Sequence, residues 1–298
     1  MMAAPLVQRR GRGKAQATLE LIEACQEILA EIQPASVRAV CYRLFTMGLI
    51  PDMGKGSTNK VSTQLVWARE TGAIPWEWIV DETREAEHIA AWSDPDQIIN
   101  AAVRGYRRDR WQDQPCRVEV WSEKGTVRGT LAPVLNELGV TFRVMHGFAS
   151  ATAVNDIATM SSAVDKPVIA LYVGDFDPSG MWMSAVDLPE RIDRYGGAVD
   201  LRRVALLQVD TKGLPGFDAD TKTGDGRHRW YVENYGPRCW ELDAMPPPLL
   251  RDRVAESIWR YIDGDAWHHA AEIEAAEVES MQQFHAAWTK RISGQASK

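Results

Sequence analysis

The stretch PVIALYVGDFDPSG, residues 167–180, joins an apolar run to two aspartates and a turn. An apolar run of this length, bounded by Pro and Gly, is typical of a buried strand. Pro178 and Gly180 then predict a tight turn into a helix. Because side chains alternate along a strand, Asp175 and Asp177 are expected to point to the same side. In open α/β sheets ligands bind at the carboxyl ends of strands, so these acids mark a candidate site.

A third acid follows an earlier apolar run. In CRVEVWSEKG, residues 116–125, a predicted strand leads into Glu123 and Lys124. If both strands lie parallel in one sheet, Glu123 lies at the same edge as Asp175 and Asp177 and adds the hard oxygen ligands that Mg²⁺ or Mn²⁺ prefers. The sequence therefore predicts a divalent-metal site made of Glu123, Asp175 and Asp177. The alternative is an incidental surface arrangement of strand-end acids.

Strands and helices alternate around these motifs. Beyond the two strands above, strands are expected at 141–147 and 201–209, helices at 124–138, 149–163, 178–195, 247–263 and 266–291, and a polar loop at 212–229. Alternation of this kind predicts an α/β fold with a mostly parallel sheet and crossover helices.

The N-terminal part has a different pattern. Helices are expected at 15–32, at 36–47 with Ser36 as its cap, and at 58–71 with Ser57 or Thr58 as its cap. A strand-like segment follows at 73–85, and a further helix is expected from Asp94 to about Trp111. Three short helices and a strand-like wing are typical of a winged helix-turn-helix, with a generic three-helix bundle as the alternative.

Composition limits the function classes. The chain has 298 residues, of which 45% are hydrophobic and 25% charged, with a net charge of −7. This length favours two domains. No apolar run reaches the roughly 20 residues of a membrane helix. Four cysteines without a CxxC pair are typical of a reduced, cytoplasmic protein. Residues 1–69 hold nine Lys and Arg against five Asp and Glu, a surplus supplied by Arg9, Arg10, Arg12 and Lys14. A basic N-terminal part suits a DNA-contacting module, or is simply a basic tail.

The motifs at 123–124 and 175–180, in this order, resemble the acid motifs of the TOPRIM domain, the metal-binding core of topoisomerases, bacterial primases and some nucleases. They resemble in particular the A subunit of type IIB topoisomerases (topoisomerase VI). That family includes the meiotic double-strand-break transesterase and the nuclease subunit of Wadjet-type plasmid-defence systems. Residues 240–245, WELDAM, resemble a late acidic element of the family, which makes Glu241 a candidate accessory acid. The alternative role of Glu241 is a helix N-terminal cap.

In this family a winged helix precedes the TOPRIM domain and carries a Tyr that attacks a DNA phosphate. The segment SVRAVCYR, residues 36–43, resembles the motif around that Tyr: Arg38 and Tyr42 match it, whereas Ala39 and Cys41 replace an Asp and an aromatic residue. The resemblance implies that Tyr42 is the nucleophile and that Arg38 holds a phosphate or stabilises the phenolate. If Tyr42 is inert, water would attack and the protein would be a hydrolytic nuclease.

The resemblance also implies a domain order and partners. The expected order is a basic tail (1–14), a winged-helix domain (15–112), a TOPRIM domain (113–265) and a C-terminal helix (266–298). The implied activity is Mg²⁺- or Mn²⁺-dependent cleavage of double-stranded DNA by a homodimer, with a phosphotyrosyl link and with Lys124 near the phosphate. Arg9, Arg10, Lys60 and Arg69 would contact DNA.

Other functional classes are weighed against this one. The chain has no GxxxxGK[ST] motif, so any ATPase would be a separate partner. The remaining alternatives are a TOPRIM hydrolytic nuclease without a covalent intermediate and a non-catalytic winged-helix DNA-binding regulator. Primase-like synthesis is disfavoured, because no zinc-binding module precedes the TOPRIM segment.

Overall fold

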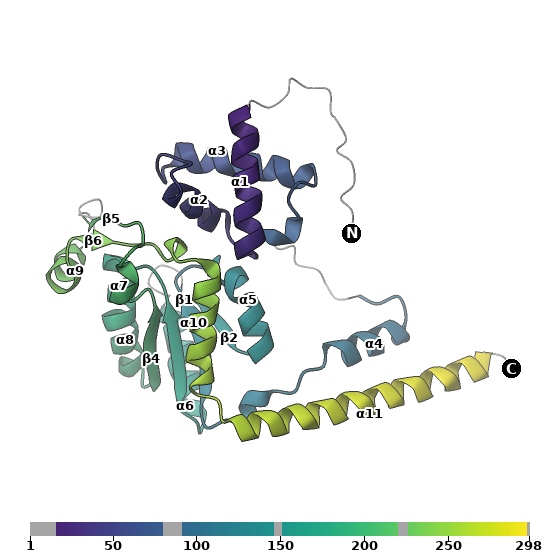
Figure 1. Ribbon diagram of the computed structural model, residues 1–298. Coiled ribbons are helices and arrows are strands. Elements are labelled where there is room, and N and C mark those ends of the chain that lie inside the picture. The colour runs from purple at the N-terminus through teal and green to yellow at the C-terminus, as the bar shows by residue number, and fades with distance from the viewer. Residues whose placement is uncertain (1–15, 80–90, 146–150, 220–225, 297–298) are drawn as a thin grey trace. The chain divides into compact units, whose positions relative to one another are not determined.

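The computed structural model describes residues 16–79, 91–145, 151–219 and 226–296 and divides them into two compact units (Figure 1). One unit contains the N-terminal helices, up to residue 79, and the chain from 118 to 259. The other contains 91–117 and the chain from 260 onward. No helix of the described residues is long and apolar enough to cross a membrane.

A four-stranded parallel sheet forms the centre of the first unit, with the strand order β2-β1-β3-β4. The strands are β1 (Arg117–Ser122), β2 (Thr141–Val144), β3 (Val168–Val173) and β4 (Val199–Ala205). Every residue of β3 is buried, as its unbroken apolar run predicts. The α/β prediction with a parallel sheet is confirmed. The order places β1 beside β3, so that the acids that follow these two strands share one edge.

Helices cover both faces of this sheet (Figure 1). They are α5 (Val127–Leu138), α6 (Ala151–Ala163), α7 (Pro178–Trp182), α8 (Leu188–Arg194) and α10 (Pro247–Trp259), and a π-helical turn, Met183–Asp187, joins α7 to α8. Trp121 and Tyr172 are fully buried against α6 and α8, whereas α10 packs on α5 and on the two strands β3 and β4. Burial of large aromatic side chains of this kind contributes strongly to the core.

The segment predicted as a polar loop at 212–229 is partly structured, so that prediction is wrong in part. Its residues include β5 (Phe217–Asp218), which pairs antiparallel with β6 (Arg238–Cys239), and the start of α9 (His228–Tyr235). Residues 220–225 lie outside the described residues. The last strand is also shorter than predicted, because the chain turns into a 3-10 helix at Gln208–Thr211.

Three N-terminal helices pack around a shared apolar core: α1 (Gln16–Ile32), α2 (Val37–Thr46) and α3 (Lys55–Glu70). Ser36 caps α2 as predicted, since its hydroxyl accepts a hydrogen bond from the Ala39 amide at 3.1 Å. The predicted start of α3 is wrong. Asp52 accepts hydrogen bonds from the Gly54 amide (2.8 Å) and from the Ser57 hydroxyl (2.9 Å), which moves the start to Lys55.

The predicted strand-like wing at 73–85 is wrong for its described part. Trp76–Trp78 is a 3-10 helix, in which the Trp78 amide bonds to the Pro75 carbonyl, and Ile79 makes only a single bridge to Ala35. Residues 80–90 lie outside the described residues. The winged-helix and TOPRIM assignments therefore stay predictions.

The second unit pairs α4 (Pro95–Gly105) and a 3-10 helix (Arg110–Asp113) with the long helix α11 (Gly264–Ala296). Asp94 caps α4 as predicted, but the helix ends at Gly105 rather than near Trp111. Arg108 and Arg110 form ion pairs with Glu277 and Glu274 of α11. Residues 95–112, which the sequence places at the end of the winged-helix domain, thus belong to the unit that packs on the C-terminal helix. The domain boundaries themselves stay predictions.

Candidate functional site

The carboxyl ends of β1 and β3 bring together Glu123, Asp175 and Asp177, as their positions in the sequence predict. Asp175 and Asp177 are buried, with 6% and 2% of their surface exposed. Burial, followed by the charges of the two aspartates, raises the pKa of Glu123 from its ordinary value of 4.5 to about 7. The three carboxylates therefore form one electrostatically coupled group in a largely dry environment.

The DFDPSG turn is held rigidly by backbone and side-chain bonds. Asp177 caps α7 by accepting a hydrogen bond from the Gly180 amide at 2.7 Å. Phe176, buried between the two acids, exchanges two backbone hydrogen bonds with Trp240 at 2.8 and 2.9 Å. A Cβ at Gly180 would lie 2.4 Å from the Asp175 carbonyl oxygen, so the close approach of the chain requires glycine.

Lys124 supplies a cation to this edge. Its ammonium lies 2.9 Å from Asp175 Oδ1, which also accepts the Leu242 amide at 2.8 Å. Although burial opposes it, the charges of Asp243 and Asp175 raise the pKa of Lys124, which therefore stays protonated. Lys124 therefore lies among the acids and its charge offsets part of theirs, whereas its expected place near a phosphate stays a prediction.

A second pair of acids, Glu241 and Asp243, lies on the other side of Lys124. The Lys124 ammonium is 3.2 Å from Asp243 Oδ2 and 3.8 Å from Glu241 Oε2. Arg38 of α2 donates from Nε to Glu241 Oε2 at 2.6 Å, and the same nitrogen lies 3.5 Å from Asp243 Oδ2. Glu241 makes no capping hydrogen bond to the 3-10 helix Leu242–Ala244 that follows it. Its carboxylate therefore joins the acid edge to α2 instead.

Tyr42 lies on the same helix as Arg38 and is buried, with 6% of its surface exposed. The Arg38 guanidinium stands 5.7 Å from the centre of the Tyr42 ring. Burial, and then the charge of Glu241, raise the pKa of Tyr42, whereas Arg38 opposes the rise. In this arrangement the phenol stays protonated, and its environment includes both the arginine and the second acid pair.

The predicted DNA-contacting residues are placed on α3 or lie outside the described residues. Lys60 is exposed on α3, and the guanidinium of Arg69 stacks at 4.8 Å on the ring of Trp76, itself 58% exposed. Lys60 is therefore open to solvent, whereas Arg69 is only half exposed and its Nε is buried. Arg9 and Arg10 belong to the N-terminal segment outside the described residues.

The donor set of the acid edge fits a hard divalent cation. It consists of carboxylate oxygens, and their mutual repulsion is relieved when a cation binds among them. Among the described residues, no three Asp, Glu, His or Cys side chains are arranged so that they could hold a metal ion together. In the structure Asp175 is bonded to Lys124 and Leu242, and Asp177 to Gly180. Both contacts of Asp175 use Oδ1, so its second carboxylate oxygen, Oδ2, is the atom that could bind a cation while Lys124 stays in place.

The raised pKa of Glu123 makes the stability of the metal-free protein depend on pH. Because the folded state binds this proton more tightly than the unfolded state, the free energy of unfolding falls as pH rises from 4.5 to about 7 and then levels off. A rise from 4.5 to about 7 corresponds to roughly 3 kcal/mol. Glu123→Gln should remove this loss, and should be more stable than wild type at about pH 8 in denaturant titrations with EDTA. Equal pH profiles of the two proteins would contradict it.

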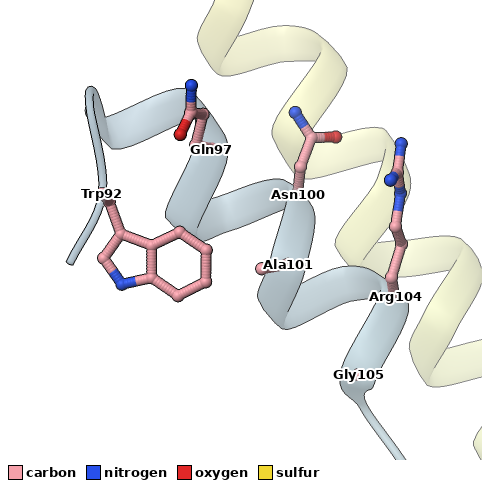
Figure 2. Close-up of a pocket in the computed structure, with 6 residues that line it drawn as sticks. All are labelled: Trp92, Gln97, Asn100, Ala101, Arg104 and Gly105. Atoms are coloured by element: carbon pink, nitrogen blue, oxygen red, sulfur yellow. The ribbon is translucent and has the colours of Figure 1, made fainter. Parts of the chain in front are cut away.

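A shallow groove lies along α4 in the other unit (Figure 2). It is lined by Trp92, Gln97, Asn100, Ala101, Arg104 and Gly105. Arg104 is the only charged side chain among these residues, and none of them is an acid or a nucleophile. The groove lining therefore offers no carboxylate, general base or nucleophile, and the acid edge is the candidate active site.

Searches of protein-family models, of curated proteins and of solved structures found no match to this chain. The resemblance to type IIB topoisomerase A subunits therefore stays a prediction, carried by the motifs alone. The acid edge, by contrast, is described directly by its contacts and charges.

Sequence reasoning missed two residues of this site. Asp243 contacts both Lys124 and Arg38, and it lies two residues after Glu241 in the WELDAM segment. Arg203 of β4 contacts the backbone of the DFDPSG turn. The only sequence signal for Asp243 is its spacing from Glu241, and Arg203 has none.

Proposed function

We propose that this chain cleaves DNA strands with the help of a divalent cation. Glu123, Asp175 and Asp177 would hold Mg²⁺ or Mn²⁺, which when bound would offset charge on the scissile phosphate and on the attacking or leaving oxygen. The observation that supports the proposal most strongly is the ion-paired bridge from the acid edge to α2. Through Lys124, Glu241, Asp243 and Arg38, the candidate nucleophile and the candidate metal ligands belong to one charged cluster.

In the proposed reaction Tyr42 attacks and Arg38 and Lys124 bind the phosphate oxygens. The phenolic oxygen forms a new bond to phosphorus, and the bond from phosphorus to a deoxyribose oxygen breaks. The phenol proton passes to a carboxylate, for which Glu241 is the candidate, and a proton returns to the leaving oxygen. Arg38 and Lys124 are paired with Glu241 and Asp243 in the structure, so a phosphate would compete with these acids for the two cations.

One observation favours a second candidate, a hydrolytic nuclease. Burial and the charge of Glu241 keep the Tyr42 phenol protonated, which disfavours it as a nucleophile in this arrangement. Water would then attack the same phosphate, and no protein–DNA bond would form. The acid edge would have the same role in both reactions.

The proposed partners follow from the same reasoning. Double-stranded DNA would bind along α3 and the basic tail, and two copies of the chain would each cut one strand. A separate ATPase would be needed for any strand passage. Each of these partners is part of the proposal and is tested with it.

Incubation of the full chain with supercoiled plasmid tests the activity. Reactions with Mg²⁺, Mn²⁺ or EDTA, each analysed before and after protease treatment, distinguish the candidates. Nicked or linear DNA that enters the gel only after protease indicates a covalent link. Free ends in both lanes indicate hydrolysis. Unchanged plasmid under all conditions would contradict cleavage by the chain alone.

The N-terminal basic residues should carry much of the DNA affinity. Deleting residues 1–14 and replacing Lys60 and Arg69 by Gln should weaken binding to all sequences alike, because phosphate contacts carry no sequence information. Each lost phosphate contact should reduce the slope of log K against log salt by about 1. Fluorescence anisotropy at several salt concentrations measures this slope. Lys290→Gln, an exposed lysine of α11, is the control, and an unchanged slope in the triple variant would reject this binding mode.

A further inference from the structure

We propose that Arg203 is the positioning residue of the acid edge: it clamps both ends of the DFDPSG turn and so orients Asp175 and Asp177. The inference rests on the proposed metal-dependent function for its consequence, but not for the clamp itself. Arg203 lies on β4, the strand next to β3, and its side chain is directed at the turn that follows β3.

The contacts of the guanidinium connect segments on both sides of the turn. Nη2 donates to the Gly174 carbonyl at 2.9 Å and also to the Asp175 carbonyl. Nη1 donates to the Gly180 carbonyl at 3.1 Å and to the Ser184 hydroxyl at 2.7 Å, and Nε donates to the Leu206 carbonyl at 2.9 Å. One planar group thus fixes the chain before the acids, after them and at the end of β4.

The acceptors of Arg203 are carbonyl oxygens and one hydroxyl, not carboxylates. Its positive charge forms no ion pair among the described residues, and it interacts electrostatically with Glu123, Asp175 and Asp177. The guanidinium also stands 5.2 Å from the centre of the Tyr172 ring, which limits its movement. A cation held in this way can orient the turn without blocking its carboxylate oxygens.

The clamp and the charge have opposite effects on a metal ion. As a nearby cation, Arg203 repels a divalent ion, so its removal alone should strengthen metal binding. As a clamp, it keeps the two aspartates in place, so its removal should weaken metal binding. Lysine separates the two roles: it keeps the charge, but an ammonium has three donors in place of the five donors of a rigid fork.

Arg203→Lys and Arg203→Met, with Arg202→Met as control, test the proposal. Arg202 is the adjacent residue on β4, but it is exposed and pairs with Asp200. Two measurements apply: Mn²⁺ affinity by calorimetry, and hydrogen exchange of the Phe176 and Gly180 amides in the metal-free protein. These amides bond to Trp240 and Asp177, so their exchange reports the order of the turn.

If Arg203 is a clamp, both of its variants should exchange these amides faster and bind Mn²⁺ about 10–100-fold more weakly, the range seen for residues that orient metal ligands. Arg202→Met should match wild type in both measurements. Wild-type affinity in Arg203→Lys, or tighter binding in Arg203→Met, would show that only the charge matters and would overturn the proposal.

Two further outcomes keep the tests separate. If wild type binds no Mn²⁺, the metal-dependent function fails. The exchange measurement still decides on the clamp: faster exchange in Arg203→Lys supports it, and unchanged exchange rejects it. If both Arg203 variants unfold, Ser184→Ala removes one acceptor of Nη1 without changing any charge. Because the Ser184 hydroxyl also bonds to the Gly180 carbonyl, the readout is the Phe176 amide: its exchange should rise in the folded protein, and protection equal to wild type would reject the clamp.

Discussion

Asp175→Asn should abolish divalent-metal binding and cleavage together. Asparagine keeps the size of the side chain and an oxygen for the Leu242 amide, but it removes the charge that holds Lys124 at 2.9 Å and that would coordinate a cation. Loss of a residue that only orients a metal ligand lowers metal affinity by roughly 10–100-fold. Loss of a direct ligand should cost more, so Mn²⁺ affinity should fall by more than about 100-fold. Calorimetry with Mn²⁺ and the plasmid assay measure the two effects.

Two matched variants define what a loss would mean. Asp200→Asn changes an exposed aspartate on β4 that pairs with Arg202, and it should leave both measurements unchanged. Asp243→Asn removes a partner of Lys124 and Arg38 that is not among the predicted ligands, so it should weaken binding less than Asp175→Asn. Equal Mn²⁺ affinity in wild type and Asp175→Asn would contradict the metal site.

The grouping of the three acids at one edge follows directly from chain position, whereas their role as a site stays a prediction. Asp175 and Asp177 come after an apolar run, and Glu123 follows another, so strand ends alone bring them to one edge once β1 and β3 are neighbours. The strand alternation of an α/β chain predicts that edge without knowledge of any contact. The start of α3 was predicted wrongly, because Asp52, outside the predicted helix, binds the Gly54 amide and the Ser57 hydroxyl and so takes Ser57 away from the capping position.

Residues that act through distant contacts were not predictable. Arg202 and Arg203 are adjacent and chemically identical in sequence, yet one is exposed and pairs with Asp200, whereas the other bonds to the turn after β3. Only the register of β4 against β3 decides which arginine faces the turn. Asp243 likewise acquires its role from Lys124 and Arg38, which are more than a hundred residues away in the chain.

The wing shows a third limit of sequence reasoning. Trp76 and Trp78 have high strand propensity, but Pro75 begins a 3-10 turn and only Ile79 pairs, with Ala35. Strand propensity describes how well a side chain fits a half-buried sheet, and up to residue 79, where the described part ends, no such sheet forms around these tryptophans. The three helices follow from periodicity, whereas the winged-helix assignment depends on strand pairing that composition does not encode, and it stays a prediction.

Tyr42→Phe should abolish covalent cleavage while DNA binding persists. The change removes only the hydroxyl of a buried ring, so the packing of α2 is kept. If Tyr42 attacks phosphorus, loss of the nucleophile should reduce the rate by roughly 10³-fold or more, as for other covalent nucleophiles. The plasmid assay with and without protease measures the rate and the protein–DNA link, and anisotropy measures binding. Tyr195→Phe, at the exposed end of α8, is the control.

The pKa of Tyr42 gives the same experiment a second readout. Because burial and the charge of Glu241 hold that pKa above its ordinary value, a reaction through the phenolate should speed up as pH rises across the neutral and alkaline range. The Arg38 guanidinium beside the ring lowers the pKa of Tyr42. Arg38→Gln should therefore raise this pKa and make the reaction slower than in wild type at the same pH. If Tyr42→Phe cuts as fast as wild type and leaves free ends, Tyr42 is a packing residue and water is the nucleophile. If Tyr42→Phe and Asp175→Asn both stop cleavage but still bind DNA, the tyrosine and the acid edge act in one reaction.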